Sequence, residues 1–237
     1  MLRSLRHSYG IKLSASDGEI GEVVDFYFDD QNWAVRYLVV ETGSWLSGRQ
    51  VLISPYAFGG CGELEQLRPL ELTREQIERS PSIPSNKPVS RKDEEEFHRH
   101  YGWPAYWKGE PSKGTRGFPI LEARDTPLPS QQALTTANYG EGAEAHLRSA
   151  KAVTGYVIQA SDGMSGHVSD FMLDTQSWTI RKLVIKTTRG MPGREVQIPT
   201  TEVDQISYDD STISVNMKVE AVEQTPEDNL APSHSPF

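Results

Sequence analysis

The feature that most constrains this chain is an internal repeat with an offset of 145 residues. The tetrapeptide Ala15–Gly18 recurs as Ala160–Gly163, and 160 − 15 gives the offset of 145. The match continues without a gap well beyond this tetrapeptide, which indicates a structural unit that is present twice. The matched pairs include Leu2-Arg3-Ser4 with Leu147-Arg148-Ser149, Asp17-Gly18 with Asp162-Gly163, Asp25 with Asp170, Trp33 with Trp178, Arg36 with Arg181, and Gly48-Arg49 with Gly193-Arg194.

The repeat predicts how the 237 residues are divided. We expect a first domain over 1–81 and a second over 147–226. Residues 82–146 do not repeat and are expected to form a connector, of which Gly109–Glu144 is rich in Gly, Pro, Ser and Thr and is expected to be irregular. The last residues, 227–237, are expected to be a disordered tail.

Within each copy the local signals are those of β-structure. Asp-Gly dipeptides such as Asp17-Gly18 favour tight hairpin turns, because glycine adopts positive φ without strain. Alternating and β-branched runs predict strands over 20–28 and 35–41, with counterparts 145 residues later. A short helix over 72–78, capped by Thr73, is expected to close the unit. About six short strands in so small a unit favour a closed barrel, which leaves no exposed sheet edge.

The combined pattern resembles the PRC-barrel family. It consists of Leu-Arg-Ser, then Ser-Asp-Gly-x-x-Gly, Val-x-Asp-Phe, Asp-x-Gln-x-Trp, and Gly-Arg-x-Val, in both copies. The resemblance implies an all-β fold of two small, SH3-like, six-stranded barrels related by internal duplication. The family includes the cytoplasmic domain of the photosynthetic reaction-centre H subunit and the C-terminal domain of a ribosome-maturation factor. It implies a protein-binding adaptor and no shared catalytic residues, although fold alone does not establish function.

The connector contains a predicted helix and an aromatic segment. Ser90 is a suitable N-cap and Gly102 a suitable stop for a helix over 90–101. Four aromatic residues follow or end it within seven positions, and they are Tyr101, Trp103, Tyr106 and Trp107. Two interpretations stay open. The favoured one is packing onto the chain's own barrels, and the other is an anchor for a protein partner, since Trp and Tyr dominate binding hot spots.

The repeated charged residues favour structural roles. Asp25 and Arg36 lie on two arms of one predicted hairpin and are expected to form an ion pair, as Asp170 and Arg181 would in the second copy. The acids Asp29, Asp30 and Asp174 lack the ligand spacing of a calcium loop, so a solvated turn is favoured.

The histidine, glutamate and cysteine residues that could take part in chemistry are also expected to have structural roles. Glu94 and His98 are four positions apart on the predicted helix, and a solvated helix face is favoured over a zinc site, which needs three or four ligands. The single cysteine, Cys61, corresponds by the offset to Ile206 and is expected to be a small buried hydrophobic residue rather than a nucleophile. We expect no metal, no cofactor and no enzyme activity.

Composition excludes several partners. The formal charge is −9 and no dense Lys/Arg run occurs, so nucleic-acid binding is not expected. No stretch approaches the ~20 apolar residues of a membrane helix, and the N-terminus lacks a signal-peptide core. One cysteine allows no intramolecular disulfide, which fits a reducing compartment. A cytoplasmic location is the expectation.

From the sequence we therefore expect a non-catalytic adaptor or scaffold that binds protein partners through its barrels and its aromatic segment. A homodimer is left open. The alternative is a module that binds an ion or small ligand in a groove between the barrels.

Overall fold

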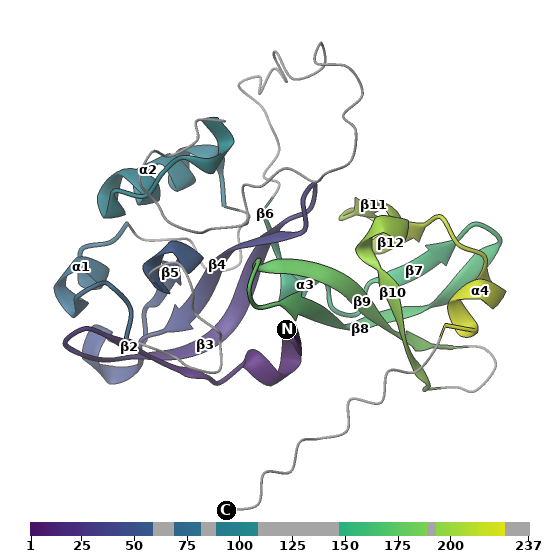
Figure 1. The fold of residues 1–237 in the computed structure, drawn as a ribbon, viewed down its shortest axis with the longest axis horizontal. Coiled ribbons are helices and arrows are strands. Elements are labelled where there is room, and N and C mark those ends of the chain that lie inside the picture. Colours follow the sequence, from purple (N-terminus) through teal and green to yellow (C-terminus); the bar gives the residue numbers. More distant parts are fainter. Residues whose placement is uncertain (59–68, 82–88, 109–146, 189–192, 226–237) are drawn as a thin grey trace, which may run out of the picture. The chain divides into compact units, whose positions relative to one another are not determined.

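A computed structural model describes residues 1–58, 69–81, 89–108, 147–188 and 193–225 of a mostly β chain (Figure 1). The predictions for Cys61, for Gly109–Glu144 and for the tail concern residues outside this described part. The chain forms two compact units. Unit 1 comprises Met1, Ser8–Ser149 and Thr175–Thr179, and unit 2 comprises Leu2–His7, Ala150–Asp174 and Ile180–Phe237. None of the helices in the described ranges is long and apolar enough to cross a bilayer.

Unit 1 contains an antiparallel sheet in the order β2-β3-β4-β5, with β6 on β3. Its strands are β2 (Lys12–Ala15), β3 (Gly18–Asp29), β4 (Ala34–Glu41), β5 (Gln50–Ile53) and β6 (Leu147–Ser149). The long strands are buried on both faces over part of their length: residues 26–29 of β3 and 37–40 of β4 are all buried. The helical segments of this unit are η2 (Gly43–Leu46), η3 (Pro55–Phe58), α1 (Arg74–Glu78), α2 (Arg91–Tyr101) and η4 (Tyr106–Lys108).

Unit 2 repeats this scheme with additional strands. The sheet order is β11-β12-β7-β8-β9, with β10 on β9 and β1 on β8, and β12 runs parallel to β7. Its strands are β1 (Leu2–Ser4), β7 (Val157–Ala160), β8 (Gly163–Asp174), β9 (Thr179–Thr187), β10 (Glu195–Pro199), β11 (Val203–Ser207) and β12 (Thr212–Val215). The helical segments are α3 (Ala150–Val153), η6 (Thr200–Glu202) and α4 (Val219–Glu223), and η1 (Arg6–Ser8) follows β1.

The closing helix is held in the same way in both units. Its first residue is Arg74 in α1 and Val219 in α4, and 219 − 74 is again 145. The carboxylate of Asp17 accepts a hydrogen bond from the backbone N–H of Arg74 at 2.9 Å, and Asp162 accepts one from Val219 at 2.7 Å. These bonds satisfy N–H groups that a helix start leaves open. The Asp-Gly turns therefore also serve as helix caps, a structural reason for their repetition.

The repeated tryptophans end the β3–β4 and β8–β9 turns in the left-handed backbone region. Trp33 has a φ of 57° and Trp178 a φ of 52°. That conformation is costly for a bulky residue unless its surroundings hold it. Ring stacking supplies part of this hold, since the Trp33 ring lies 5.4 Å from that of Phe28 and the Trp178 ring 5.5 Å from that of Phe58.

The expected pair of Asp25 with Arg36 is not the ion pair that forms. Asp25 lies opposite Val39, three positions along β4 from Arg36, because the hairpin closes with Asp29 opposite Ala34. Arg36 binds Asp29 instead, with 2.9 Å between Nη2 and Oδ2.

The second copy follows the same pattern. Arg181 lies 3.7 Å from Asp174, the counterpart of Asp29. Asp29 is only 5% exposed, so the solvated turn expected there is also wrong.

Candidate functional site

Helix α2 presents a buried polar face to the sheet of unit 1. Ser90 caps it through a capping box with Asp93, and Gly102 ends it in the left-handed conformation, as the sequence predicted. Glu94 and His98 are 1% and 5% exposed, so the solvated helix face expected for them is wrong. Together with Phe97, they form a stripe at i, i+3 and i+4, a spacing that signals a buried face even where two of the members are polar.

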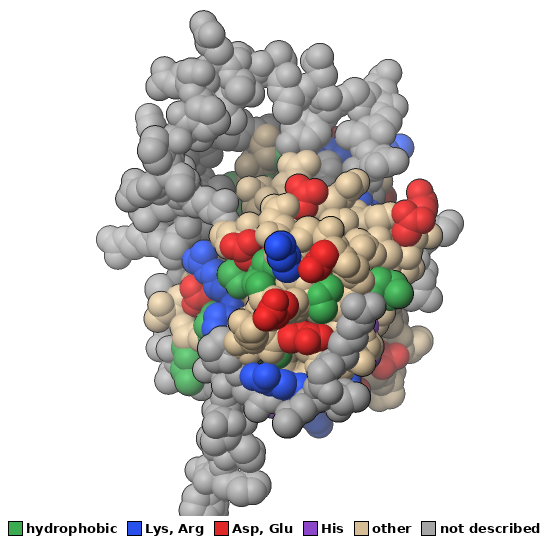
Figure 2. Space-filling view, turned by 90° about the vertical axis from the view of Figure 1, so that its right-hand side faces the viewer, with side chains coloured by type: hydrophobic (Ala, Val, Ile, Leu, Met, Phe, Trp, Pro, Cys, Tyr) green, Lys and Arg blue, Asp and Glu red, His purple; other side chains and the backbone are tan. Residues whose placement is uncertain are grey.

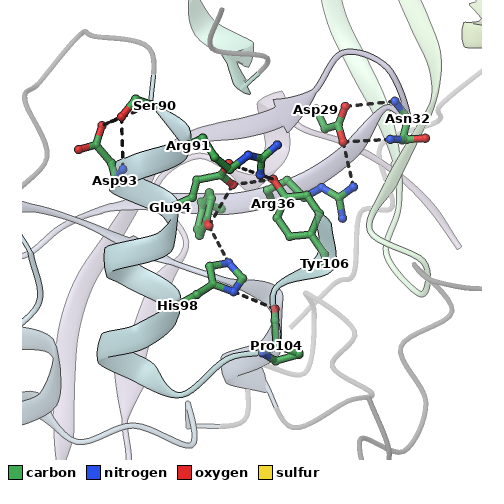
Figure 3. Close-up of polar contacts among 11 residues, drawn as sticks. Asp29, Asn32, Arg36, Ser90, Arg91, Asp93, Glu94, His98, Pro104 and Tyr106 are labelled. Atoms are coloured by element: carbon green, nitrogen blue, oxygen red, sulfur yellow. Dashed lines mark hydrogen bonds and ion pairs between the residues drawn. The ribbon is translucent and has the colours of Figure 1, made fainter. Parts of the chain in front are cut away.

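Glu94 is the centre of a hydrogen-bond network between α2, β4 and η4 (Figure 3). Its carboxylate accepts from the Tyr106 hydroxyl at 2.5 Å and from Arg91 Nη1 at 2.6 Å, and the Tyr37 hydroxyl lies 3.3 Å away. Burial raises the pKa of Glu94, although the hydrogen bonds from Tyr106 and the charge of Arg91 oppose that rise. Burial, reinforced by the Glu94 charge, raises the pKa of Tyr106 in turn.

His98 connects this network to the aromatic segment. Its Nδ1 lies 2.8 Å from the carbonyl oxygen of Pro104, and its Nε2 lies 2.9 Å from the Tyr37 hydroxyl. A carbonyl only accepts, so Nδ1 carries a proton. Burial lowers the pKa of His98 to about 4, against backbone hydrogen bonds that raise it, and the nearby cations Arg36 and Arg91 lower it further. In the neutral ring Nε2 is therefore the acceptor, and Tyr37 donates to it.

Arg36 extends the network toward the β3–β4 turn. Its guanidinium carbon lies 3.8 Å from the centre of the Tyr106 ring, a stacked cation–π arrangement. Its partner Asp29 also accepts from the side chain of Asn32 at 3.1 Å and from the N–H of Gln31 at 2.9 Å. Burial alone would raise the pKa of Asp29, but the charge of Arg36 and these hydrogen bonds outweigh it and lower that pKa.

The described residues around this network leave only a small cavity. The cavity beside His98 and Tyr106 has a volume of about 10 Å³, and Val35, Arg36, Ser54, Pro55 and Tyr56 complete its lining. Such a space accommodates one water molecule at most. The arrangement therefore fastens the connector helix and η4 onto β4 and leaves little free space among the described residues around it.

The aromatic segment packs against the same helix. Tyr101 stacks on Trp103 with 4.2 Å between ring centres, and Trp107 meets the His98 ring edge-on at 4.7 Å. Arg91 lies 4.6 Å from the centre of a Trp107 ring. All four aromatic residues are partly buried, so each contacts unit 1 and also keeps some surface in solvent. Their suggested partner-binding role stays a prediction.

Replacing Tyr106 by phenylalanine tests the network directly. The ring and its stacking on Arg36 remain, but the hydroxyl that donates to the buried Glu94 is lost. We expect the free energy of unfolding to fall by about 2 kcal/mol, the range for a hydrogen bond to a charged group. Tyr156→Phe is the control, because its edge-on contact with Tyr208, 5.9 Å between ring centres, is retained. Equal urea midpoints for the two variants would contradict the role assigned to the Tyr106 hydroxyl.

Unit 1 also carries an open cleft of about 510 Å³ between β2, β3, the end of β4, and η2. Gly21 and Trp45 line it, and the Trp45 indole N–H is fixed by donation to the carbonyl of Ile20 at 2.7 Å. The Arg74 guanidinium carbon lies 5.1 Å from the centre of a Trp45 ring. Sequence patterns do not reveal this cleft, since its lining comes from four separate segments.

The cleft contains a pair of carboxylates that face each other. Glu22 of β3 and Glu41 of β4 are direct cross-strand neighbours and both are exposed. Like charges placed opposite each other destabilise a sheet, and a cation bound between them would remove that repulsion. Glu19, the third acid of the lining, lies 3.2 Å from Lys12.

Comparison of the two copies shows which residues of this cleft recur 145 positions later and which do not. Gly21 and Thr42 recur as Gly166 and Thr187, and both threonine hydroxyls donate to an arginine carbonyl, at 2.7 and 3.2 Å. The charged lining does not recur. The counterparts of Lys12, Glu19, Glu22, Glu41 and Arg74 are Val157, Met164, His167, Lys186 and Val219. The fold therefore does not require the charged residues of the cleft.

Comparison with known proteins adds no relative to these observations: no model of a known protein family matches this chain, and no curated protein matches it either.

Proposed function

We propose that this chain is a tandem PRC-barrel protein that acts as a non-catalytic adaptor, and that the cleft of unit 1 takes a basic segment of a protein partner. The corresponding bounds of the elements in the two units support a duplication. The observation that carries the function is the cleft, whose facing acids Glu22 and Glu41 are absent from the equivalent positions of the second copy.

The surface favours charge over apolar contact for partner binding. Across the described part of the chain, the large hydrophobic side chains that are exposed are Met1, Leu2 and Met164. On the face shown in Figure 2, acidic and basic side chains are interspersed and hydrophobic ones form small separate areas. The net charge of −9 attracts a basic segment over a distance, and the cleft adds facing carboxylates and an aromatic wall to hold it.

The test uses two synthetic decapeptides, one of Lys, Arg and Gly and one in which Glu replaces each basic residue. We expect the basic peptide to bind the full chain and to shift the Trp45 indole N–H signal in an NMR spectrum, and the acidic peptide to do neither. Glu22→Gln/Glu41→Gln should weaken binding about fivefold to tenfold, the effect of losing two exposed ion pairs.

The matched control is Glu95→Gln/Glu96→Gln, which removes the same charge from exposed positions of α2. It should leave the affinity within about twofold, as expected for the small effect of distant screened charges. Equal losses in both double variants would show that the peptide responds only to overall charge. A Trp45 signal that does not move would place the binding outside the cleft.

A further inference from the structure

Each copy of the repeat places its first strand in the unit formed mainly by the other copy. Leu2–Ser4 and Leu147–Ser149 are counterparts, 145 residues apart, and form β1 and β6. However, unit 2 holds β1, which pairs with β8, and unit 1 holds β6, which pairs with β3. The two copies have therefore exchanged equivalent strands.

The edge of β3 in unit 1 recognises the Leu-Arg-Ser segment residue by residue. Ser149 Oγ donates to Asp25 Oδ2 at 2.5 Å, and Arg148 Nε donates to Asp30 Oδ2 at 2.8 Å. Leu147 is 1% exposed and belongs to a core cluster with Tyr27. Backbone pairing supplies affinity at such an edge, and the side-chain positions supply selectivity.

The edge of β8 in unit 2 repeats the serine contact with Leu2–Ser4, but not the other two: Leu2 is 38% exposed, and Thr175 stands where unit 1 has Asp30. The Ser4 hydroxyl donates to Asp170, the counterpart of Asp25. The N–H of Leu5 donates to the carbonyl of Phe171 at 2.9 Å, and the N–H of Arg6 donates to Asp170 Oδ1 at 3.0 Å. Ser4 and Leu5 are 4% and 0% exposed, so the segment is built into the unit.

We propose that these two edges are strand-binding sites selective for the serine of a Leu-Arg-Ser segment, and that they hold the segment when it belongs to a separate polypeptide. The serine–aspartate contact is the selective element, because a hydroxyl donating to a carboxylate in a water-poor site is stronger than a neutral hydrogen bond. This proposal does not depend on the cleft or its ligand.

The experiment cuts the folded full chain once. A protease recognition sequence is inserted between Asp125 and Thr126, and the purified protein is cleaved under native conditions. The fragments then have no covalent link, yet each supplies one strand to the other's main unit. We expect native mass spectrometry and size-exclusion chromatography to show one 1:1 complex that persists on dilution.

Variants decide whether the exchanged strands hold the fragments together. Ser4→Ala/Ser149→Ala removes both hydroxyls and should raise the dissociation constant of the cleaved protein about a hundredfold, tenfold for each bond. The control is Ser16→Ala/Ser161→Ala, another pair of counterparts. Their hydroxyls donate to the carbonyls of Leu72 and Met217, so each contact lies within one fragment.

The control pair should change the dissociation constant less than about threefold, as expected for exposed sites. Fragments that separate on dilution of the cleaved wild type would overturn the proposal. So would a Ser4→Ala/Ser149→Ala variant that binds as tightly as the control.

Discussion

Replacing Gly21 by alanine is expected to lower the free energy of unfolding by about 3 kcal/mol or more. Two costs act together at this position. Its φ of +144° lies in a region that side chains strain, at about 1–3 kcal/mol. A Cβ there would also lie 1.9 Å from the carbonyl oxygen of Glu41, so the β3–β4 ladder has to shift, at a further cost of about 1–3 kcal/mol.

Two other glycines separate these costs. Gly10 has a φ of +77° with nothing within 4 Å of the position that a Cβ would take, so Gly10→Ala tests backbone strain alone, at about 1 kcal/mol. At Gly166, the counterpart of Gly21, a Cβ would lie 2.3 Å from the carbonyl oxygen of Lys186, which tests the clash. The expected order of urea midpoints, from lowest, is Gly21→Ala, Gly166→Ala, Gly10→Ala. A Gly21→Ala variant as stable as Gly10→Ala would contradict the close approach.

Acidification from pH 6.5 to pH 4 is expected to remove about 3 kcal/mol of stability through His98. Burial lowers the pKa of this group from 6.5 to about 4 in the folded protein. Between these values the unfolded chain binds a proton that the folded one does not, so stability falls as pH falls. Each pKa unit of difference corresponds to about 1.4 kcal/mol.

Other charged groups around His98 affect the size of this loss. Arg36 of β4 and Arg91 of α2 act with burial against the protonated ring. Glu94 works in the opposite direction, because its raised pKa means that the folded state takes up a proton more readily than the unfolded chain as pH falls. Tyr37, Tyr56 and Tyr106, which also face the ring, stay neutral in this range since burial raises the pKa of each.

The check is the pH dependence of urea unfolding. His98→Gln should remove most of the loss between pH 6.5 and pH 4, while being less stable at neutral pH. His100→Gln, on the same helix but exposed, should keep the wild-type profile because His98 is intact. Glu94→Gln should steepen the loss, since the opposing proton uptake is gone. Parallel profiles for His98→Gln and wild type would exclude His98 as the source.

The sequence predicted the elements that local patterns determine. Three predicted elements form within two residues of their expected bounds. They are the hairpin at Asp17-Gly18, the capped helix after Ser90 and the short helix after Thr73. Each depends on turn or capping preferences that act within a few positions. The mostly β class followed from the same signals.

Contacts between residues far apart in the sequence could not be predicted from these local patterns. The partner of Arg36 differs from the expected one because the hairpin closes with Asp29 opposite Ala34, which places Asp25 opposite Val39, and no local pattern in β3 marks this register. The burial of Glu94 depends on Tyr37, which is 57 residues away in the sequence, and on Tyr106. The exchange of Leu2–Ser4 with Leu147–Ser149 was hidden for another reason. The two segments are identical in sequence and each edge offers an aspartate to the serine, so the repeat itself carries no signal of which copy fills which site.

The exchanged strands also set an order of events during synthesis. Unit 1 cannot be completed before Leu147–Ser149 leave the ribosome, 94 residues after the end of β5 at Ile53 (147 − 53). At about 5–20 residues per second this is a wait of roughly 5–20 s. Throughout that interval the edge of β3 is open to other nascent or misfolded strands. The amino-terminal strand likewise waits for β8, so the two halves of the chain mature together rather than one after the other.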